Sequence, residues 1–379
     1  MEFVYLFFIL CYALLLWSLR KHWRQEGTFI AKEEFEASKT ILVPFRNEAE
    51  HLPRLLVNLL HIAPCSQEVI FIDDSSTDGS SAIVSDFIRK ENLNHWVLLQ
   101  SAGLGKKAAL TTGVQYTQAE VILTTDADCS LPPDWVRRMT RAFDQPNIQL
   151  VAGPVMAVGG TGLFARFQEI EWSSILLVTN YFFSTNRPLM CSGANLAYRR
   201  SAFTAVQGYL GNEIHPSGDD EFLLKKIVRH FGGPAVLYLK DKDLLVATQA
   251  AASWSSFIHQ RVRWAAKWRV HRSVFHASSA ILAFLLAIFE IASVQLLFGS
   301  MIPKLVFFFF WSVKILIERK VLGDVLAGFG LSYPLRLYMA TSFLHPVYSV
   351  LVGIRGVSGK YSWKGRNHKT SFNFASRNI

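Results

Sequence analysis

The sequence has few charged residues, and long stretches lack them altogether. Asp, Glu, Lys and Arg make up 18% of the 379 residues, against 51% for the hydrophobic types. Residues 3–17 carry no charge and are followed by Arg20, Lys21 and Arg24. A cleaved signal peptide would have basic residues before such a run and a small-residue cleavage site after it, and both are missing. We therefore predict that residues 1–19 are a retained membrane anchor, with the following basic residues in the cytosol.

Cysteine is scarce as well. Cys11, Cys65, Cys129 and Cys191 form no CxxC pair and show no metal-ligand spacing. In a cytosolic context we expect them to be free thiols.

The net charge of +10 comes without any nucleic-acid-binding motif, so we expect no nucleic-acid partner. Basic residues gather instead beside apolar segments, which suits a protein that lies against anionic lipid or holds phosphate groups. The basic residues of this group are Arg261, Arg263, Lys267, Arg269 and Arg272.

Long apolar runs return after residue 276. They cover residues 279–299, 303–317 and 334–353. We expect residues 277–353 to be membrane segments and residues 354–379 to form a basic cytosolic tail. Three full crossings would leave that tail outside, against its charge. We therefore expect one run not to cross, and we assign this role to 334–353, with His345-Pro346 at its centre.

Glu290 lies within an otherwise apolar run. A carboxylate at membrane depth is a functional hypothesis by default, and Lys314 in the next run is a candidate partner. A structural ion pair would give the same sequence, so both interpretations stay open.

Between the apolar segments, short strands alternate with helices. The predicted strands are residues 40–45, 68–72, 95–100 and 120–125. This alternation predicts an α/β fold with a mostly parallel sheet and helices on both faces, and we place the domain at residues 38–252. Ligands of such folds bind at the carboxyl ends of the strands. Asn47 and Glu50 resemble a capping box for the first helix, and residues 162–183 resemble an amphipathic helix pressed on the membrane.

The fourth predicted strand ends in Asp126 and Asp128. Side chains two residues apart on a strand point to one side, so both carboxylates would project together. Two like charges held so close repel each other unless a cation lies between them. The pair therefore predicts a cation site, and the alternative is a solvated strand end, where Asp and Pro are common.

The other polar motifs also follow predicted strands, in a fixed order. They are Pro44-Phe45-Arg46-Asn47-Glu48, Asp73-Asp74-Ser75-Ser76-Thr77-Asp78-Gly79 and Gly103-Leu104-Gly105-Lys106-Lys107, and later Ser217-Gly218-Asp219-Asp220 and Gln260-Arg261-Val262-Arg263-Trp264. With Asp126-Ala127-Asp128, this ordered set resembles the family 2 glycosyltransferases of the GT-A fold, membrane-bound members included, over residues 38–270. A phosphate-binding P-loop does not fit, because Gln100 takes its first glycine position and Lys107 its Ser/Thr position.

The resemblance implies a nucleotide-sugar donor, which we expect to be UDP-linked. The residues implied at the donor nucleotide are Pro44, Glu48, Asp73, Asp74, Lys106 and Asp126. Asp126 and Asp128 would hold Mg²⁺ or Mn²⁺ through hard oxygen ligands, and the ion would bridge the diphosphate. For Lys106 the alternative is a solvated helix start.

The resemblance also implies the acceptor side of an inverting reaction. Asp220 aligns best with the base that takes the proton of the acceptor hydroxyl, and Asp219 replaces the glutamate common at the preceding position. Arg263 would hold the departing diphosphate. Asn195, Gln260 and Trp264 would contact the acceptor. The alternative for both aspartates is that they cap a helix. We expect residues 253–276 to form an interfacial helix that carries the Gln260–Trp264 motif, so that one helix can serve both the active site and the lipid surface.

Together these features predict a multi-pass protein of the inner (plasma) membrane with a cytosolic GT-A domain. It would transfer a sugar to a polysaccharide or lipid acceptor, in contact with membrane lipid. The alternatives are a single transfer to a lipid and a non-catalytic membrane scaffold that keeps the fold. A sugar nucleotidyltransferase is disfavoured, because the glycine-rich basic start expected for it is missing.

Overall fold

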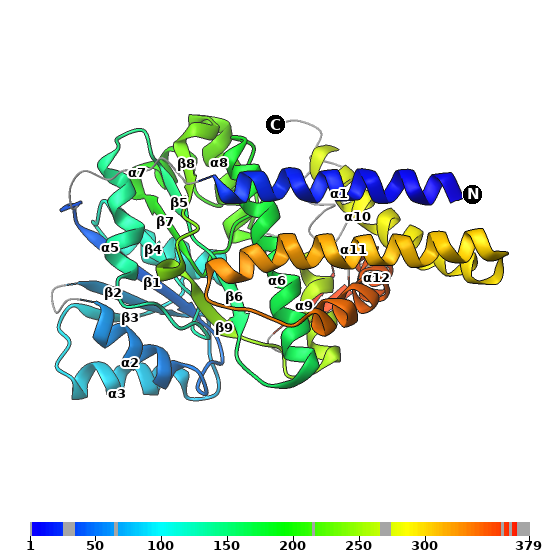
Figure 1. Ribbon diagram of the computed structural model, residues 1–379. Helices are drawn as coiled ribbons and strands as arrows, with labels where there is room; N and C mark the ends of the chain where they lie inside the picture. Colours follow the sequence, from blue (N-terminus) through cyan, green and yellow to red (C-terminus); the bar gives the residue numbers. More distant parts are fainter. Residues whose placement is uncertain are drawn as a thin grey trace.

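The computed structural model describes residues 2–25, 35–63, 67–213, 217–265, 274–357, 360–363 and 366–369. A seven-stranded sheet of order β3-β2-β1-β4-β7-β5-β8 forms the centre of the α/β domain (Figure 1). The strands are β1 (Lys39–Phe45), β2 (Glu68–Asp73), β3 (Trp96–Gln100), β4 (Val121–Thr124), β5 (Leu150–Ala152), β7 (Leu196–Arg199) and β8 (Val236–Tyr238). All neighbours pair in parallel except at β7, which runs antiparallel to β4 and β5. The predicted, mostly parallel sheet is confirmed.

Helices cover both faces of this sheet, because the strand residues alternate between two cores. On β1, Ile41 and Val43 belong to one core with Leu55 of α2 (Leu52–Ile62), while Leu42 belongs to the other. The second core also contains residues of α4 (Lys106–Tyr116) and α8 (Asp219–Phe231). The other elements of the domain are α3 (Ser80–Lys90), α5 (Trp135–Thr140), η1 (Arg141–Asp144), β6 (Val155–Val158), α7 (Arg200–Ala205), η2 (Gly233–Ala235), η3 (Lys242–Leu244) and β9 (Val246–Gln249).

The predicted capping box is wrong. Helix α2 begins at Leu52, after His51, and no side chain caps it. Asn47 instead has a positive φ of 50°, and its Oδ1 accepts a hydrogen bond from the backbone N–H of Thr77 at 2.8 Å. The segment after β1 is therefore a loop that packs on the loop after β2.

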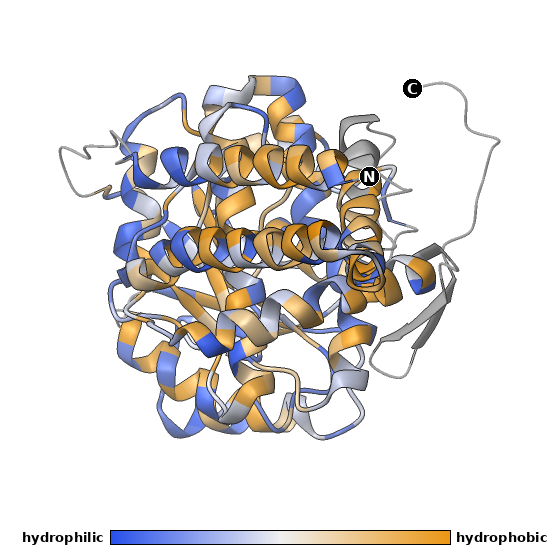
Figure 2. Cartoon of the chain, turned by 45° about the vertical axis from the view of Figure 1, so that its right-hand side comes forward, coloured by the Kyte–Doolittle hydropathy of each residue, from blue (hydrophilic) through white to orange (hydrophobic). Residues whose placement is uncertain are grey.

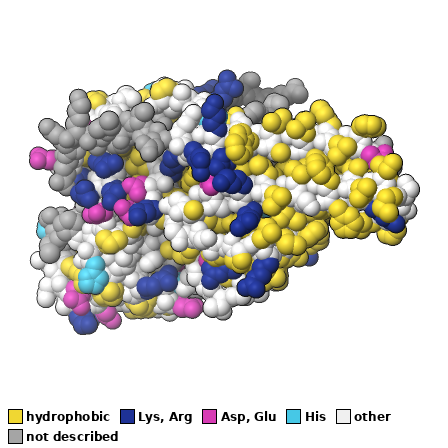
Figure 3. Space-filling model, viewed as in Figure 1, with side chains coloured by type: hydrophobic (Ala, Val, Ile, Leu, Met, Phe, Trp, Pro, Cys, Tyr) yellow, Lys and Arg dark blue, Asp and Glu magenta, His cyan; other side chains and the backbone are white. Residues whose placement is uncertain are grey.

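Four long helices extend from the domain; with η5 (Ser293–Phe298) we call them the helical arm (Figure 1). They are α1 (Glu2–Arg24), α10 (Val274–Ala292), α11 (Met301–Gly328) and α12 (Leu335–Val357). Most of the arm is hydrophobic (Figure 2), and hydrophobic side chains cover its far end, while Lys and Arg gather where it meets the domain (Figure 3). Exposed side chains at the far end include Phe3, Phe7, Met301, Ile302, Leu305 and Phe308.

Three segments are long and apolar enough to cross a membrane: Glu2–Arg24, Ile281–Phe298 and Leu335–Gly356. The last contains the run that we assigned as non-crossing, so length and composition give no ground for that assignment. The predicted run 303–317 is instead part of α11, a longer helix with several charged residues that is not among the three.

A buried polar cluster joins the helices of the arm. Lys314 Nζ lies 3.7 Å from Glu290 Oε1, as expected for a pair, but only 2.6 Å from Glu318 Oε1. Glu318 also accepts hydrogen bonds from the hydroxyls of Tyr12 and Ser342. The cluster thus contacts α1, α10, α11 and α12, and it crosslinks the arm.

Helix α6 (Gly162–Ser184) does not lie on the surface as an amphipathic membrane helix. It packs between the sheet domain and the helices α1, α11 and α12 (Figure 1). Its polar residues Gln168, Glu169 and Glu171 are buried, with at most 4% of each exposed. The prediction for 162–183 is therefore wrong, because these side chains find partners inside the molecule.

The last predicted segments are described in part. Helix α9 (Trp254–Ala265) covers the first half of the predicted interfacial segment, and Lys267, Arg269 and Arg272 lie outside the described residues. In the tail, β10 (Lys360–Trp363) and β11 (Arg366–Lys369) form an antiparallel pair.

Candidate active site

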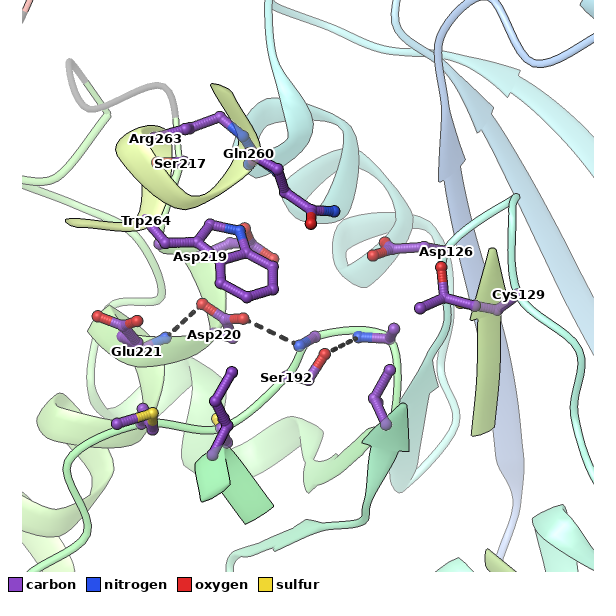
Figure 4. Close-up of a pocket in the computed structure, with 18 of the residues that line it drawn as sticks. Asp126, Cys129, Ser192, Ser217, Asp219, Asp220, Glu221, Gln260, Arg263 and Trp264 are labelled. Carbon is purple, nitrogen blue, oxygen red and sulfur yellow. Dashed lines mark hydrogen bonds between the residues drawn. The ribbon is translucent and has the colours of Figure 1, made fainter. Parts of the chain in front are cut away.

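A cavity of about 680 Å³ lies at the carboxyl ends of the strands β1, β2 and β4. The strand ends and the start of α8 form one part of its wall, and α6, α9 and α12 form another. Eleven of the predicted site residues line it: Pro44, Glu48, Asp74, Lys106, Asp126, Asp128, Asp219, Asp220, Gln260, Arg263 and Trp264. In Figure 4, Asp126 faces Asp219 and Asp220 across a space, with Gln260 above it and the indole of Trp264 beside Asp219.

Lys106 joins the motifs from two sides of this cavity. Its Nζ lies 2.6 Å from Asp126 Oδ1 and 3.3 Å from Asp219 Oδ2. Burial alone would lower the pKa of this ammonium, but Asp126, Asp219 and Asp220 together raise it, so Lys106 is a permanent cation. The alternative of a solvated helix start is excluded.

The glycine loop places Lys106 at the first residue of α4. Gly105 precedes it with φ +92°, a conformation that L side chains rarely adopt. The backbone N–H of Gly105 donates to Asp74 Oδ1 at 2.8 Å. Asp74 therefore fixes the loop that carries the lysine.

Asp126 and Asp128 fit a hard divalent cation. Both carboxylates line the cavity, and Thr248 Oγ1 of β9 donates to Asp128 Oδ2 at 3.2 Å. Burial, followed by the charge of Asp128, raises the pKa of Asp126 against the opposing effect of Lys106. In the described part of the chain, no group of three or more His, Cys, Asp or Glu residues could hold a metal by itself. Mg²⁺ commonly binds through one or two carboxylates together with substrate phosphates, which is the arrangement that this pair allows.

Asp219 and Asp220 open α8 without capping it. The N-cap is Gly218, so the alternative of two capping aspartates does not hold, although both lie in the first turn. Asp219 is 7% exposed and pairs with Lys106. Asp220 Oδ2 accepts from the backbone N–H of Gly193 at 3.0 Å, and Oδ1 accepts from that of Glu221 at 2.8 Å (Figure 4). Asp220 is the more exposed carboxylate of the two.

Gln260, Arg263 and Trp264 share the cavity face of α9. Arg261, predicted among the basic residues for lipid or phosphate, is only 4% exposed. Its guanidinium donates to both carboxylate oxygens of Glu171, Nε to Oε1 at 2.8 Å and Nη2 to Oε2 at 2.5 Å. The prediction of a lipid-facing Arg261 is therefore wrong. We missed Glu171, although an acidic residue in an apolar helical run was a usable signal.

The part of the cavity around Glu48 contains another residue that we missed. His51 Nδ1 lies 2.7 Å from Glu48 Oε2, and its Nε2 lies 3.2 Å from Gln249 Oε1. His51 lines the cavity and holds the Glu48 carboxylate. The position of His51 three residues after Glu48 was a usable signal for this pair.

Asp73, predicted at the nucleotide, instead ends β2 and holds the loop that follows it. It is 3% exposed and does not line the cavity. Its carboxylate accepts from the backbone N–H of Ser76 at 2.8 Å and from the hydroxyl of Ser81. Asp74 alone of this pair reaches the cavity.

Asn195, predicted at the acceptor, is fully buried. Its Nδ2 donates to the carbonyls of Pro154 and Leu244, each at 2.8 Å, and its Oδ1 accepts from Trp135 Nε1 at 2.8 Å. The prediction of an acceptor contact is therefore wrong, because every polar atom of the side chain is used inside the fold. The preceding residues, 191–194, do line the cavity.

Part of the chain that forms this cavity matches a known protein family. Residues 40–206 match the family described as Glycosyl transferase family 2. The region of residues 40–206 is thus similar to the family 2 glycosyltransferases, and we call it the family 2 domain. The resemblance found in the sequence is confirmed.

Relatives of the family 2 domain include two enzymes named undecaprenyl-phosphate 4-deoxy-4-formamido-L-arabinose transferase. The one from Pseudomonas fluorescens is 31% identical over 105 residues, 26% of this chain and 30% of the relative. The one from Pectobacterium carotovorum is 30% identical over 173 residues, 44% of this chain and 50% of the relative. The chain thus spans half or less of the length of these curated relatives.

A solved structure shares the fold of the family 2 domain and the helical arm. It is the mannosyltransferase PcManGT from Pyrobaculum calidifontis in complex with GDP-Man and Mn²⁺. The TM-score is 0.58 at 16% identity, over 94% of this chain and 97% of that one. This similarity confirms the predicted GT-A fold.

Proposed function

We propose that this protein transfers a sugar from a nucleotide-sugar donor to a lipid acceptor at the membrane, with inversion at the anomeric carbon. The single observation that carries this proposal is the position of Lys106 between Asp126 and Asp219 in one cavity. Such a site offers a cation and two further carboxylates where a sugar diphosphate and a metal ion would meet. The matched family makes glycosyl transfer the chemistry to test.

In the donor half of the cavity, carboxylates offer hydrogen-bond acceptors to the nucleoside, and a lysine and a metal ion would offer positive charge to the diphosphate. The carboxylates of Glu48 and Asp74 can accept hydrogen bonds from the base and ribose. Asp126 and Asp128 would hold Mg²⁺ or Mn²⁺, which supplies Lewis-acid stabilisation of the diphosphate when bound. Lys106 adds a fixed positive charge beside the same phosphates.

The acceptor half of the reaction falls to α8 and α9. Asp220 can take the proton of an acceptor hydroxyl, and its bonds to two backbone N–H groups hold the carboxylate in place. Arg263 would balance the charge of the leaving diphosphate, and the indole of Trp264 offers a face to the acceptor sugar or headgroup.

A lipid acceptor is favoured by the far wall of the cavity. Apolar side chains from α6, α10 and α12 line it. These are Trp172, Ile175, Leu176, Ala283 and Val352. Two of these helices belong to the apolar arm, so a lipid could enter from the membrane without crossing water. The relatives named for undecaprenyl phosphate make a polyisoprenyl phosphate the first acceptor to test.

We place the protein in the inner (plasma) membrane as a multi-pass protein, with the catalytic domain in the cytosol. The basic residues at the junction of arm and domain support this orientation (Figure 3). Arg20 and Arg24 lie there and pair with Asp324 at 2.6 and 2.9 Å, so they also dock α1 on α11.

One assay tests the proposal. Purified protein in lipid nanodiscs is incubated with a panel of UDP- and GDP-sugars, Mg²⁺ or Mn²⁺, and undecaprenyl phosphate or a glycolipid extract. We expect one lipid product with a single added sugar by mass spectrometry. A polymeric product would show that the protein extends a sugar chain instead of adding a single sugar. A folded protein that releases no nucleotide from any donor would contradict the proposal and favour a scaffold.

A further inference from the structure

Glu171, Arg261 and Tyr348 join three helices at the wall of the active-site cavity. Glu171 lies on α6, Arg261 on α9 and Tyr348 on α12. The fork of Arg261 binds both oxygens of Glu171, at 2.8 and 2.5 Å, and the hydroxyl of Tyr348 donates to Glu171 Oε1 at 3.0 Å. All three residues line the cavity. We call this set the clasp.

Aromatic rings enclose the guanidinium of the clasp. Its central carbon lies 4.5 Å from the ring centroid of Phe257, 5.3 Å from that of Trp172 and 4.2 Å from that of Trp264. Trp172 and Trp264 also contact each other edge to face, with centroids 5.4 Å apart. The arginine therefore fixes the indole that we place at the acceptor.

The clasp also reaches a second residue of the α9 motif. Arg261 Nη1 donates to Gln260 Oε1 at 2.6 Å. The orientation of Gln260 and Trp264 thus depends on the buried ion pair between Arg261 and Glu171. A buried ion pair gains little stability over apolar residues of the same volume, so its presence calls for another role.

We propose that Glu171 and Arg261 are positioning residues that hold Gln260 and Trp264 toward the acceptor, and that they couple α12 of the membrane arm to this site. The inference rests on the proposed function and deepens it. Arg261, the second residue of the Gln260–Trp264 motif, thereby acts without contacting the substrate.

The chain contains a matched control on the same helix. Arg166 Nη1 lies 2.6 Å from Glu169 Oε2, and Tyr333 OH donates to the same oxygen at 2.5 Å. This second set also combines an arginine, a glutamate of α6 and a tyrosine hydroxyl from the arm side. None of its members lines the cavity, and Glu169 is 1% exposed.

The test compares Glu171→Met/Arg261→Met with Arg166→Met/Glu169→Met in nanodiscs. Both double variants remove the two charges together, so neither leaves a buried charge alone. We expect the clasp variant to lose about 100-fold in the kcat of transfer, because small misplacements of positioned groups carry penalties of that size. Its affinity for UDP or GDP with Mn²⁺ should stay within about threefold. The control should keep both values.

A second readout does not depend on turnover. Hydrogen exchange of the backbone of α9 should accelerate in the clasp variant and stay unchanged in the control. Tyr348→Phe, which removes one hydroxyl, should give a smaller change in the same direction. Should either double variant fail to fold, Glu171→Gln with its control Glu169→Gln replaces it in both measurements.

Each outcome of these measurements either supports or overturns the proposed role of the clasp. Lost transfer with retained nucleotide binding and faster α9 exchange supports the clasp. Full transfer in the clasp variant, or equal loss in both variants, overturns it. If the wild type transfers no sugar, the proposed function fails, and the exchange of α9 alone then decides whether the pair fixes this helix.

Discussion

The Lys106 ammonium lies 2.6 Å from the carboxylate of Asp126. This contact joins the glycine loop before α4 to the end of β4. Because the same ammonium reaches Asp219 at 3.3 Å, it also brings the start of α8 to that place. Three motifs far apart in the sequence thus act on one point, where a diphosphate is expected.

Replacing Lys106 by Met should abolish donor use. The cavity would keep the carboxylates of Asp126, Asp219 and Asp220 without their shared cation, so a diphosphate would meet net repulsion. We expect kcat/KM for the donor to fall by about 100-fold or more. Steady-state kinetics measures the fall in kcat/KM, and calorimetric titration with UDP or GDP and Mn²⁺ should show a loss of nucleotide affinity.

The neighbouring Lys107 provides the control for this variant. It is 6% exposed, donates to the carbonyl of Asn212 at 2.8 Å and lies 4.4 Å from the ring centroid of Phe222. Lys107→Met should lower the melting temperature but leave nucleotide affinity of the folded protein unchanged. Equal nucleotide affinity in the two variants would remove Lys106 from the site.

Replacing Asp128 by Asn should abolish the stabilisation that Mn²⁺ and nucleotide together give the folded protein. A ligand at 100 times its dissociation constant stabilises a folded protein by about 2.7 kcal/mol, so Mn²⁺ with UDP or GDP should raise the wild-type melting temperature. The shift should vanish in the variant, because an amide is a poor ligand for a hard cation. An undiminished shift would place the metal elsewhere. Nucleotide without metal serves as the baseline.

The two aspartates of α8 should differ in kinetics. Asp220→Asn removes the proposed base, so kcat should fall by about 10²–10⁴-fold with little change in donor KM. Asp219→Asn removes a partner of Lys106, so donor KM should rise more than kcat falls. Steady-state kinetics with a hydroxyl acceptor separates the two. The reverse pattern would assign the base to Asp219.

Much of the fold could be predicted because its signals are local. The first four strands after residue 38 are short apolar runs that end in polar motifs, and all four were placed within one residue, whereas β5 to β9 were not predicted. The positions of Asp126, Asp128 and Lys106 followed from the rule that parallel strands present their carboxyl ends to one edge. Strand alternation does not explain why both aspartates face the cavity, because β4 ends at Thr124 and Asp128 lies in the turn that follows.

The remaining errors concern contacts that no local pattern encodes. Asn195 and Asp73 stand in polar motifs but turn into the fold, because buried backbone groups needed their partners. Arg261 is one residue from Gln260 and one turn from Trp264, yet its partner Glu171 lies on another helix. Burial of α6 depended on the arm packing over it, which hydropathy cannot show.

Asn195 should prove to be a stability residue. Asn195→Ala leaves two carbonyls and the indole N–H of Trp135 without their partners in a fully buried place. Each such group costs about 1–3 kcal/mol, so the melting temperature should fall by several degrees. Nucleotide affinity of the folded fraction should persist. A variant of normal stability that loses only acceptor affinity would restore the sequence-based role.

The most direct test of the account is the anomalous diffraction of a crystal grown with Mn²⁺ and UDP or GDP. We expect one manganese peak at the cavity, within coordination distance of Asp128 and of a diphosphate oxygen, with Lys106 beside the phosphates. A manganese ion and nucleotide bound outside the cavity that Asp126 and Asp220 share would contradict it.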